Sequence, residues 1–330
     1  IAVNSATSAL HIACLALDLG PGDWLWTSPN TFVATANCGL YCGAKVDFVD
    51  IDQETYNMSV TSLADKLAIA EKKGLLPKIV IPVHLAGQPC DMIPIHKLSK
   101  QYGFKIIEDA SHAIGASYNQ IKIGSCIHSD ITVFSFHPVK IITSAEGGMA
   151  LTNNSKIADR LLHLRNSGIT RNKLYMQPKP KNEIWNYHQV ELGYNYRMND
   201  VQAALGLSQI KRLDSNIITR RKVAKRYDNE LANFPIKLPY QLSNTYSSYH
   251  LYPICILINE IKTTQKEMYD ALWQNDIAVN LHYIPVYLHP YYQSLNFARG
   301  YCPNAETYFK SAISIPVFVG LSFENQSKII

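Results

Sequence analysis

The segment that decides the fold reads Val133-Phe-Ser-Phe-His-Pro-Val-Lys140-Ile-Ile-Thr-Ser-Ala-Glu146-Gly-Gly148. Apolar residues precede Lys140, and a Glu-Gly-Gly turn follows it before a second apolar run at 149–152. We expect a strand to deliver the lysine to a loop in which glycines allow close backbone approach. An amine in such a partly dry place can lose its proton near neutral pH, against a reference pKa of about 10.4, and can then form a Schiff base with an aldehyde. A solvated loop lysine is the alternative.

The composition favours a large core and argues against membranes and nucleic acids as partners. The chain has 330 residues, which is long enough for one large and one smaller domain. Hydrophobic residues make up 47% of it and charged residues 17%, so a substantial core is available. No apolar run approaches about 18 residues, so we predict no membrane span. The formal net charge is +5, and the clearest basic segment, 211–226, has the spacing of a solvated helix face. Nucleic acid is therefore a weak hypothesis.

Cysteine and histidine usage predicts a reducing compartment and no metal site. The cysteines are Cys14, Cys38, Cys42, Cys90, Cys126, Cys255 and Cys302. Their number is odd, no CxxC pair occurs, and most have apolar neighbours, as buried free thiols do in the cytoplasm. The histidines are scattered and form no HExxH motif, so we expect no metal. The chain begins without Met in an apparent strand, and we expect an N-terminal segment to be missing.

Apolar runs alternate with helical patterns through the first half of the chain. The expected strands are 23–27, 45–49, 78–83, 104–108, 131–136 and 149–152, and the expected helices are 7–17, 31–41, 60–73, 93–102 and 156–164. This rhythm predicts an α/β fold with a mostly parallel sheet that is covered by helices on both faces.

The second half changes character. A long helix is expected over 199–231, and segments 249–258 and 278–283 with a helix at 264–274 are expected to form a compact α+β unit. We therefore predict a large domain at 1–210, and a long helix with a small C-terminal α+β domain at 211–330.

Two junctions between a strand and a helix could bind a flat, phosphorylated molecule. The turn Asn4-Ser-Ala-Thr7-Ser8 is rich in hydroxyls, and a helix that starts at Thr7 would present free N–H groups to a phosphate. A plain N-cap is the alternative. Phe32, which follows another strand, could stack on a heterocycle or could be a core residue.

A carboxylate ends a further strand. In Ile106-Ile-Glu108-Asp109-Ala-Ser-His112, Asp109 lies where open α/β sheets bind ligands, and it could pair with a protonated ring nitrogen. Alternatively it caps the next helix. His112, three residues later, would share that helical face and reach a ring substituent, or would serve a structural role.

In their order along the chain, these motifs resemble the DegT/StrS family of pyridoxal-phosphate (PLP) sugar aminotransferases. The resemblance implies the fold type I, aspartate-aminotransferase-like architecture for the large domain. It rests on Asn4-Ser-Ala-Thr7, Asp47-Phe-Val-Asp-Ile-Asp52, Pro82-Val-His-Leu-Ala-Gly-Gln88, Glu108-Asp109-Ala-Ser-His112, Ser135-Phe-His-Pro-Val-Lys140, Glu146-Gly-Gly148, Gly193-Tyr-Asn195-Tyr-Arg197 and His282-Tyr283.

The resemblance implies roles around the cofactor ring. It implies that Lys140 is the Schiff-base lysine and that Asp109 is the partner of the pyridine nitrogen. His112 stands where the family places a hydrogen-bonding partner of the ring hydroxyl, although glutamine is common there. Phe32 matches the aromatic residue that stacks on the ring.

The resemblance also implies phosphate contacts and a subunit arrangement. Ala6, Thr7 and Ser135 match phosphate-contacting positions. Asn195 matches a residue that reaches the phosphate from a second subunit, which implies a homodimer with shared active sites. Ser167 departs from the histidine that is usual at its position.

Within the family, segments 4–10, 141–148, 199–209, 250–253 and 282–287 resemble the 4-aminotransferases of pseudaminic acid biosynthesis. This likeness implies L-glutamate as donor and UDP-2-acetamido-2,6-dideoxy-β-L-arabino-hexos-4-ulose as acceptor, with His282 and Tyr283 as contacts of the sugar or nucleotide, or as packing residues. Alternatives are another UDP-4-keto or dTDP-3-keto sugar, or a non-catalytic PLP-fold protein. Family dehydratases carry histidine in place of Lys140, and a nicotinamide enzyme would carry the GxGxxG motif that this chain lacks.

Overall fold

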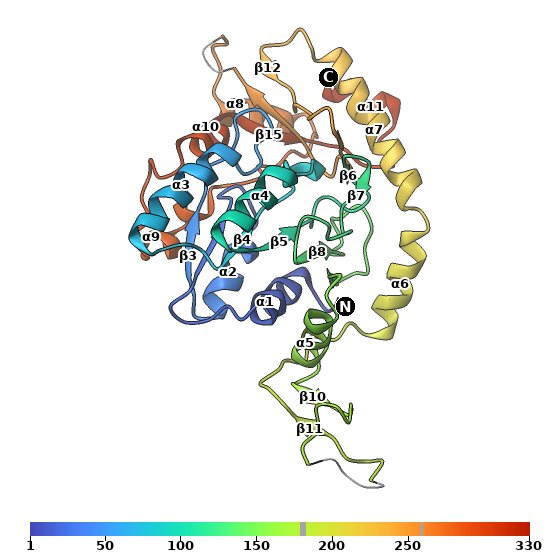
Figure 1. Ribbon diagram of the computed structural model, residues 1–330. Helices are drawn as coiled ribbons and strands as arrows, with labels where there is room; N and C mark the ends of the chain where they lie inside the picture. The colour runs from blue at the N-terminus through green and yellow to red at the C-terminus, as the bar shows by residue number, and fades with distance from the viewer. Residues whose placement is uncertain (179–182, 258–259) are drawn as a thin grey trace.

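A mostly parallel sheet forms the centre of the computed structural model, which describes residues 1–178, 183–257 and 260–330 (Figure 1). The strand order is β1-β9-β8-β5-β4-β2-β3. These strands are β1 (Ala2–Val3), β2 (Trp24–Thr27), β3 (Lys45–Phe48), β4 (Ile79–Ile81), β5 (Lys105–Asp109), β8 (Ile131–Ser135) and β9 (Gly148–Leu151). From β3 to β8 all neighbours pair in parallel, and only the β8–β9 and β9–β1 pairings are antiparallel. The predicted fold class is confirmed.

Helices cover both faces of this sheet. They are α1 (Ala6–Ala16), α2 (Ala34–Tyr41), α3 (Val60–Lys73), α4 (Met92–Tyr102) and α5 (Ser155–Arg165). Alternate strand residues enter different cores because successive side chains point to opposite faces. In β4, Ile79 and Ile81 pack in the core that contains α1, α2 and α5, whereas Val80 packs in the core that contains α3 and α4.

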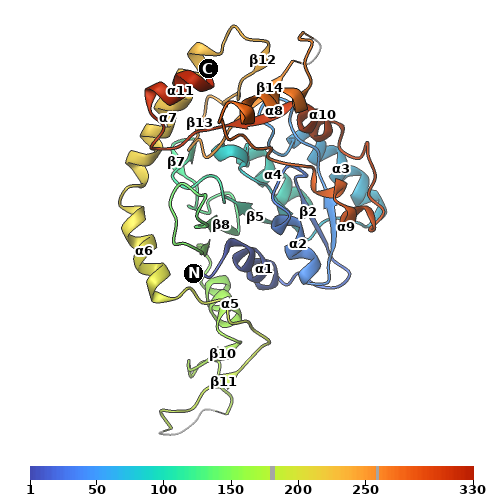
Figure 2. The ribbon, with the colours of Figure 1, turned by 180° about the vertical axis from the view of Figure 1, so that it is seen from behind.

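The long helix predicted at 199–231 is two helices, α6 (Asp200–Ile210) and α7 (Leu213–Glu230). The two have different surroundings: α7 buries five side chains, including Ile217 and Tyr227, whereas α6 buries none of its own. Figures 1 and 2 show α7 and α6 following one another along one side of the molecule. The prediction of a solvated basic face is wrong at Arg220, which is buried and donates to the backbone carbonyls of Tyr249, His250 and Val317.

The C-terminal part contains a second sheet with the order β12-β14-β15. Its elements are β12 (Ile236–Lys237), β14 (Tyr252–Ile256), α8 (Gln265–Gln274), α9 (Pro290–Gln293), α10 (Pro303–Ser311), β15 (Ala312–Ile315) and α11 (Phe323–Ile329). Segment 249–258 supplies β14, although its expected last residue lies outside the described residues. Segment 278–283 supplies no strand to this sheet, whose third strand is β15. The domain boundary between residues 210 and 211 stays a prediction.

Residues 166–178 and 183–198 form an arm that leaves the body between α5 and α6 (Figure 1). It contains the paired strands β10 (Ile169–Thr170) and β11 (His188–Gln189), and a separate small sheet joins β6 (Ser117–Tyr118), β7 (Ile121–Lys122) and β13 (Thr245–Tyr246). Within the described ranges, no helix is long and apolar enough to cross a membrane.

Gly148 allows the start of α1 to approach the sheet. A Cβ atom at this position would lie 2.5 Å from the backbone N of Ala6 and 2.5 Å from the carbonyl carbon of Ser5. Backbone atoms cannot yield as a flexible side chain does, so any larger residue would push α1 away from β9. The close approach at this glycine is therefore between β9 and the start of α1, whereas the sequence had predicted close approach of the backbone to the Lys140 amine.

Replacing Gly148 with alanine should therefore destabilise the fold. We expect Gly148→Ala to lower the free energy of unfolding by about 1–3 kcal/mol through overpacking, as measured by urea denaturation. Gly20→Ala is the matched control, because a Cβ atom there meets no atom within 4 Å. Equal stability of the two variants would contradict the assigned role of Gly148.

Candidate active site

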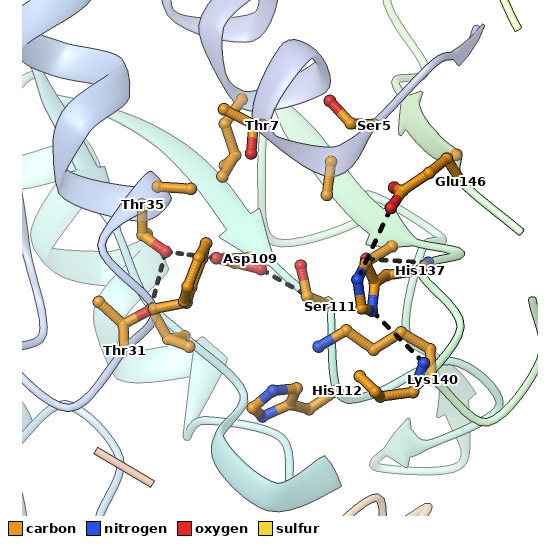
Figure 3. A pocket seen from close by; sticks show the side chains of 18 of the residues that line it. Ser5, Thr7, Thr31, Thr35, Asp109, Ser111, His112, His137, Lys140 and Glu146 are labelled. Atoms are coloured by element: carbon orange, nitrogen blue, oxygen red, sulfur yellow. Dashed lines mark hydrogen bonds and ion pairs between the residues drawn. The ribbon is translucent and has the colours of Figure 1, made fainter.

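A cavity of about 270 Å³ opens where the parallel strands end (Figure 3). Its walls come from the start of α1, the segment around the start of α2, the ends of β5 and β8, and the loop after β8. The predicted site residues that line it are Ala6, Thr7, Phe32, Asp109, His112, Ser135, Lys140 and Tyr283. The structure places Asn195 and His282 outside this lining. The carboxyl edge of an open α/β sheet is the usual place for a ligand.

The start of α1 presents backbone N–H groups to the cavity. Ser5 is the N-cap and accepts a hydrogen bond from the Ser8 N–H at 3.1 Å, so the N-cap role left open for this turn belongs to Ser5. Ala6 and Thr7 are the first two helical residues, and both line the cavity. The N–H groups of a first helical turn have no intrahelical acceptor, and they coincide with the positive end of the helix dipole. This end suits a phosphate.

Asp109 is a buried carboxylate that is held on two sides. Its Oδ2 accepts a hydrogen bond from the Thr35 hydroxyl at 2.6 Å, and its Oδ1 accepts one from the Ser111 N–H at 3.1 Å. The Thr35 hydroxyl in turn lies 2.7 Å from that of Thr31. Thr31 precedes α2 and Thr35 lies in its first turn, so the junction between β2 and α2 meets the end of β5 at this carboxylate.

The alternative prediction, that Asp109 caps a helix, is wrong. The residues after β5 form turns, and Asp109 closes a turn through the Ser111 N–H. His112 therefore does not share a helical face with Asp109, and the turn brings it to the cavity instead. An Asp side chain that bonds the N–H two residues later is a common competitor of helix capping, and sequence spacing alone does not separate the two.

Lys140 extends from the loop after β8 into the cavity. The side chain is half-buried, and within the part of the chain that the structure describes its amine forms no hydrogen bond or ion pair. Burial lowers the pKa of Lys140 to about 8, although the nearby charge of Asp109 acts in the opposite direction. The alternative of a solvated loop lysine is therefore wrong, because the side chain is half-buried in the cavity. At the lowered pKa, a useful fraction of the amine is uncharged near neutral pH.

Three histidines gather beside this amine: His112 and His250 are buried, and His282 is partly buried. Burial and the positive charge of Lys140 lower the pKa values of His112 and His250 well below the ordinary range, and they lower that of His282 to about 4. The rings of His112 and His250 lie 4.5 Å apart between centroids. All three imidazoles are thus neutral at pH 7.

The donor set fits pyridoxal phosphate. Four groups of the PLP molecule follow one another around its ring: the ring nitrogen, the ring oxygen, the aldehyde and the phosphate arm. In Figure 3, Asp109, His112, Lys140 and the start of α1 with Thr7 follow one another around the cavity in the same order. Phe32 is 60% exposed although it lines this cavity, which leaves its ring face open to a flat molecule.

Several site residues were not found by reading the sequence. Thr35 and Ser111 hold Asp109, and His137 and Glu146 line the cavity with their side chains 3.6 Å apart. Thr35 follows Thr31 by one helical turn, and this spacing was the only feature of the sequence that pointed to Thr35. His250 was indicated only by its place in segment 250–253 of the family resemblance, and nothing in the sequence indicated its contact with His112, which joins distant segments.

Comparisons with known proteins agree with this geometry. The model of the DegT/DnrJ/EryC1/StrS aminotransferase family matches residues 1–330. A Campylobacter jejuni UDP-4-amino-4,6-dideoxy-N-acetyl-beta-L-altrosamine transaminase is 38% identical over 315 residues, which are 95% of this chain and 79% of that protein. A Vibrio cholerae GDP-perosamine synthase is 33% identical over 327 residues, 99% of this chain and 83% of that protein. Streptococcus pneumoniae Spr1654 in its PMP form superposes with a TM-score of 0.88 at 30% identity, covering 100% of this chain and 85% of that chain.

Fold and site together define a fold type I enzyme that depends on PLP. The chain belongs to the DegT/DnrJ/EryC1/StrS aminotransferase family. It is a transaminase of nucleotide sugars, so the predicted enzyme class and cofactor are confirmed.

The lowered pKa of Lys140 predicts a pH profile for capture of the cofactor. Only the uncharged amine reacts with an aldehyde, so the capture rate of the cofactor-free protein should rise about tenfold per pH unit below pH 8 and level off above it. Stopped-flow absorbance with added PLP measures this rate, and Lys140→Arg is the control that should show no capture. A rate that keeps rising to about pH 10.4, the value of an ordinary lysine, would contradict the assignment.

Proposed function

We propose that this protein transfers an amino group from L-glutamate to carbon 4 of UDP-2-acetamido-2,6-dideoxy-β-L-arabino-hexos-4-ulose. The product would be a UDP-4-amino sugar for pseudaminic acid-type biosynthesis. The observation that carries amino transfer is the half-buried amine of Lys140 in one cavity with Asp109. The choice of sugar is supported by segments 141–148 and 282–287 and by the identity to the Campylobacter jejuni transaminase.

Lys140 is the proposed attachment point of the cofactor and the base of the reaction. Bound PLP supplies an aldehyde that takes up amino groups and a ring that spreads the negative charge left on the donor's α-carbon. The Nζ atom of Lys140, once free, accepts the proton from that α-carbon and gives it up again to complete the amino transfer. Burial keeps the amine uncharged often enough to act in this way, since it lowers the pKa to about 8.

Asp109 is the proposed partner of the protonated ring nitrogen. Its carboxylate is buried and oriented by Thr35 and Ser111, so it offers a fixed negative charge at the base of the cavity. A fixed charge in a water-poor site needs no reorganisation during the reaction and acts strongly there. The neutral imidazoles nearby add no positive charge that would compete for this carboxylate.

The remaining contacts hold the cofactor in place. The N–H groups of Ala6 and Thr7 and the hydroxyl of Ser135 are proposed to bind the phosphate, and Phe32 is proposed to stack on the ring. His282 is proposed to contact the substrate. Its Nδ1 lies 2.9 Å from the Ser314 hydroxyl, so its Nε2 is the ring atom left for that contact.

A second candidate keeps the chemistry and changes the acceptor. The 33% identity to a GDP-perosamine synthase favours another nucleotide keto-sugar, and a different 4-keto UDP-sugar or a 3-keto dTDP-sugar belongs to the same group. The residues that hold the cofactor do not choose among these acceptors.

Turnover of a panel of UDP-, GDP- and dTDP-keto-sugars with L-glutamate tests the proposal. We expect the highest kcat/KM for the UDP-2-acetamido-2,6-dideoxy-4-ulose, and a loss of about 10²–10⁴-fold or more in Lys140→Ala because the base is removed. Lys156→Ala changes an exposed lysine of α5 and should leave turnover unchanged. Near-normal turnover by Lys140→Ala would refute the chemistry, and preference for another sugar would replace the first candidate by the second.

We also propose that the protein is a homodimer and that Asn195 serves the partner's site. Asn195 is exposed and lies outside the cavity of its own chain. Apolar side chains are exposed on α6 and on the arm: Leu174, Ile184, Trp185, Leu192, Val201 and Leu207. An exposed apolar surface of this kind is typical of a protein interface. A second copy of the chain is the proposed occupant.

Mixing two inactive variants tests the shared site. In a hybrid of Lys140→Ala and Asn195→Ala chains, one of the two sites would contain neither change, so random pairing should restore about a quarter of wild-type activity. Lys140→Ala mixed with Asp109→Ala is the control, because both changes affect the same chain's site and no intact site can form. No recovery in the first mixture, measured on a verified dimer at limiting PLP, would contradict the role of Asn195.

We further propose a reducing compartment such as the cytoplasm. All the cysteines are buried and free in the structure. Buried free thiols are the usual state of cysteine in a reducing environment.

A further inference from the structure

The hydroxyl of Tyr283 is a polar group of the cavity that the proposed roles leave unused. Tyr283 lines the cavity, and its Oη lies 3.1 Å from Nε2 of His112. The two rings are inclined by only 18° with centroids 6.1 Å apart. Among the described residues, His112 is the single hydrogen-bonding partner of this hydroxyl.

The backbone decides which nitrogen of His112 carries the proton. The Ala86 N–H points at Nδ1 at 3.3 Å, and a backbone N–H can only donate, so Nδ1 must be the unprotonated acceptor. Burial, and next the charge of Lys140, holds the pKa of this imidazole well below its usual range, so the ring is neutral and its single proton is on Nε2. Nε2–H therefore donates to Tyr283 Oη.

Tyr283 is left with its own proton to donate. Burial, and next the negative charge of Asp109, raises the pKa of this phenol, so it stays protonated. An oxygen that already accepts from His112 directs its own O–H elsewhere, and the described residues offer it no acceptor. The cavity is the remaining direction.

We propose that Tyr283, oriented by His112, donates a hydrogen bond to the ring oxygen of bound PLP, and that His112 is a positioning residue without its own contact to that oxygen. The inference rests on the proposed placement of the cofactor between Asp109 and Lys140. On that placement the ring oxygen lies between the ring nitrogen and the aldehyde, the stretch of wall at which His112 is seen in Figure 3. It changes the role that the family resemblance implied for His112.

The surroundings hold this pair in one arrangement. The Ser248 hydroxyl donates to the His112 carbonyl at 2.9 Å, and the His250 ring packs against that of His112. The titratable groups that face the pair are His250, His282, Tyr308, Lys140 and Asp109. Both neighbouring imidazoles are neutral at pH 7, so Lys140 and Asp109 are the charges that act on the pair.

The pH dependence of the bound cofactor's visible absorbance tests the inference without any substrate. A donor to the ring oxygen draws off its negative charge. Without it, the proton shared by that oxygen and the nitrogen of the Lys140 linkage is held more tightly. Tyr283→Phe should therefore raise the pH midpoint of the absorbance change by about one unit or more. Tyr227→Phe is the control, because that buried hydroxyl bonds the Pro316 carbonyl away from the cavity, and it should cause no shift.

Two changes at His112 separate orientation from direct contact. His112→Gln keeps a donor for Tyr283 and should leave the midpoint near the wild-type value, whereas His112→Leu should raise it. Adding Tyr283→Phe to His112→Leu should cause little further shift, because both changes remove the same interaction. An unshifted midpoint in Tyr283→Phe, or equal shifts in His112→Gln and His112→Leu, would overturn the proposal.

These outcomes are independent of the sugar. A wild-type protein that shows no visible band would overturn the assignment of Lys140 on which the inference depends. Failure to aminate any keto-sugar would leave the absorbance measurement and its result unchanged.

Discussion

The parallel pairing of β5 with β8 is the constraint on which the site depends. It sets Asp109 beside Val133, so the last residue of β5 and the loop after β8 leave the sheet at the same edge. The carboxylate and the amine of Lys140 can then face one cavity although 31 positions of sequence separate them. On the other side of β8, β9 runs antiparallel and its Gly148 admits the start of α1, which brings a helix N-terminus to the same edge.

Few charged side chains line this cavity. One amine with a lowered pKa faces one buried carboxylate, and the three histidines around them are neutral. A neutral imidazole can fix the direction of a hydrogen bond without changing the charge balance that the lysine and the carboxylate set. The pKa of Lys140 is therefore lowered although the wall is polar, because desolvation outweighs the opposing charge of Asp109.

The parts predictable from sequence are those set by local pattern. Apolar strands followed by a carboxylate and by a lysine indicated Asp109 and Lys140, and alternating strands and helices indicated the mostly parallel sheet. Contacts between distant segments were not predictable. Thr35 reaches Asp109 across 74 positions and Ser248 reaches His112 across 136, and no spacing rule relates such pairs. The alternative in which Asp109 caps a following helix is wrong for a local reason, since its side chain accepts from the Ser111 N–H and closes a turn instead.

The central claim is that Lys140 is the residue that holds PLP, and covalent trapping tests it most directly. Borohydride reduction of the PLP-loaded protein fixes the cofactor to the amine that carries it, and peptide mass spectrometry then locates the modified lysine. The account predicts the added mass on the peptide that contains Lys140, and its loss together with the visible band in Lys140→Ala. A modified lysine elsewhere, or an unchanged band in Lys140→Ala, would contradict it.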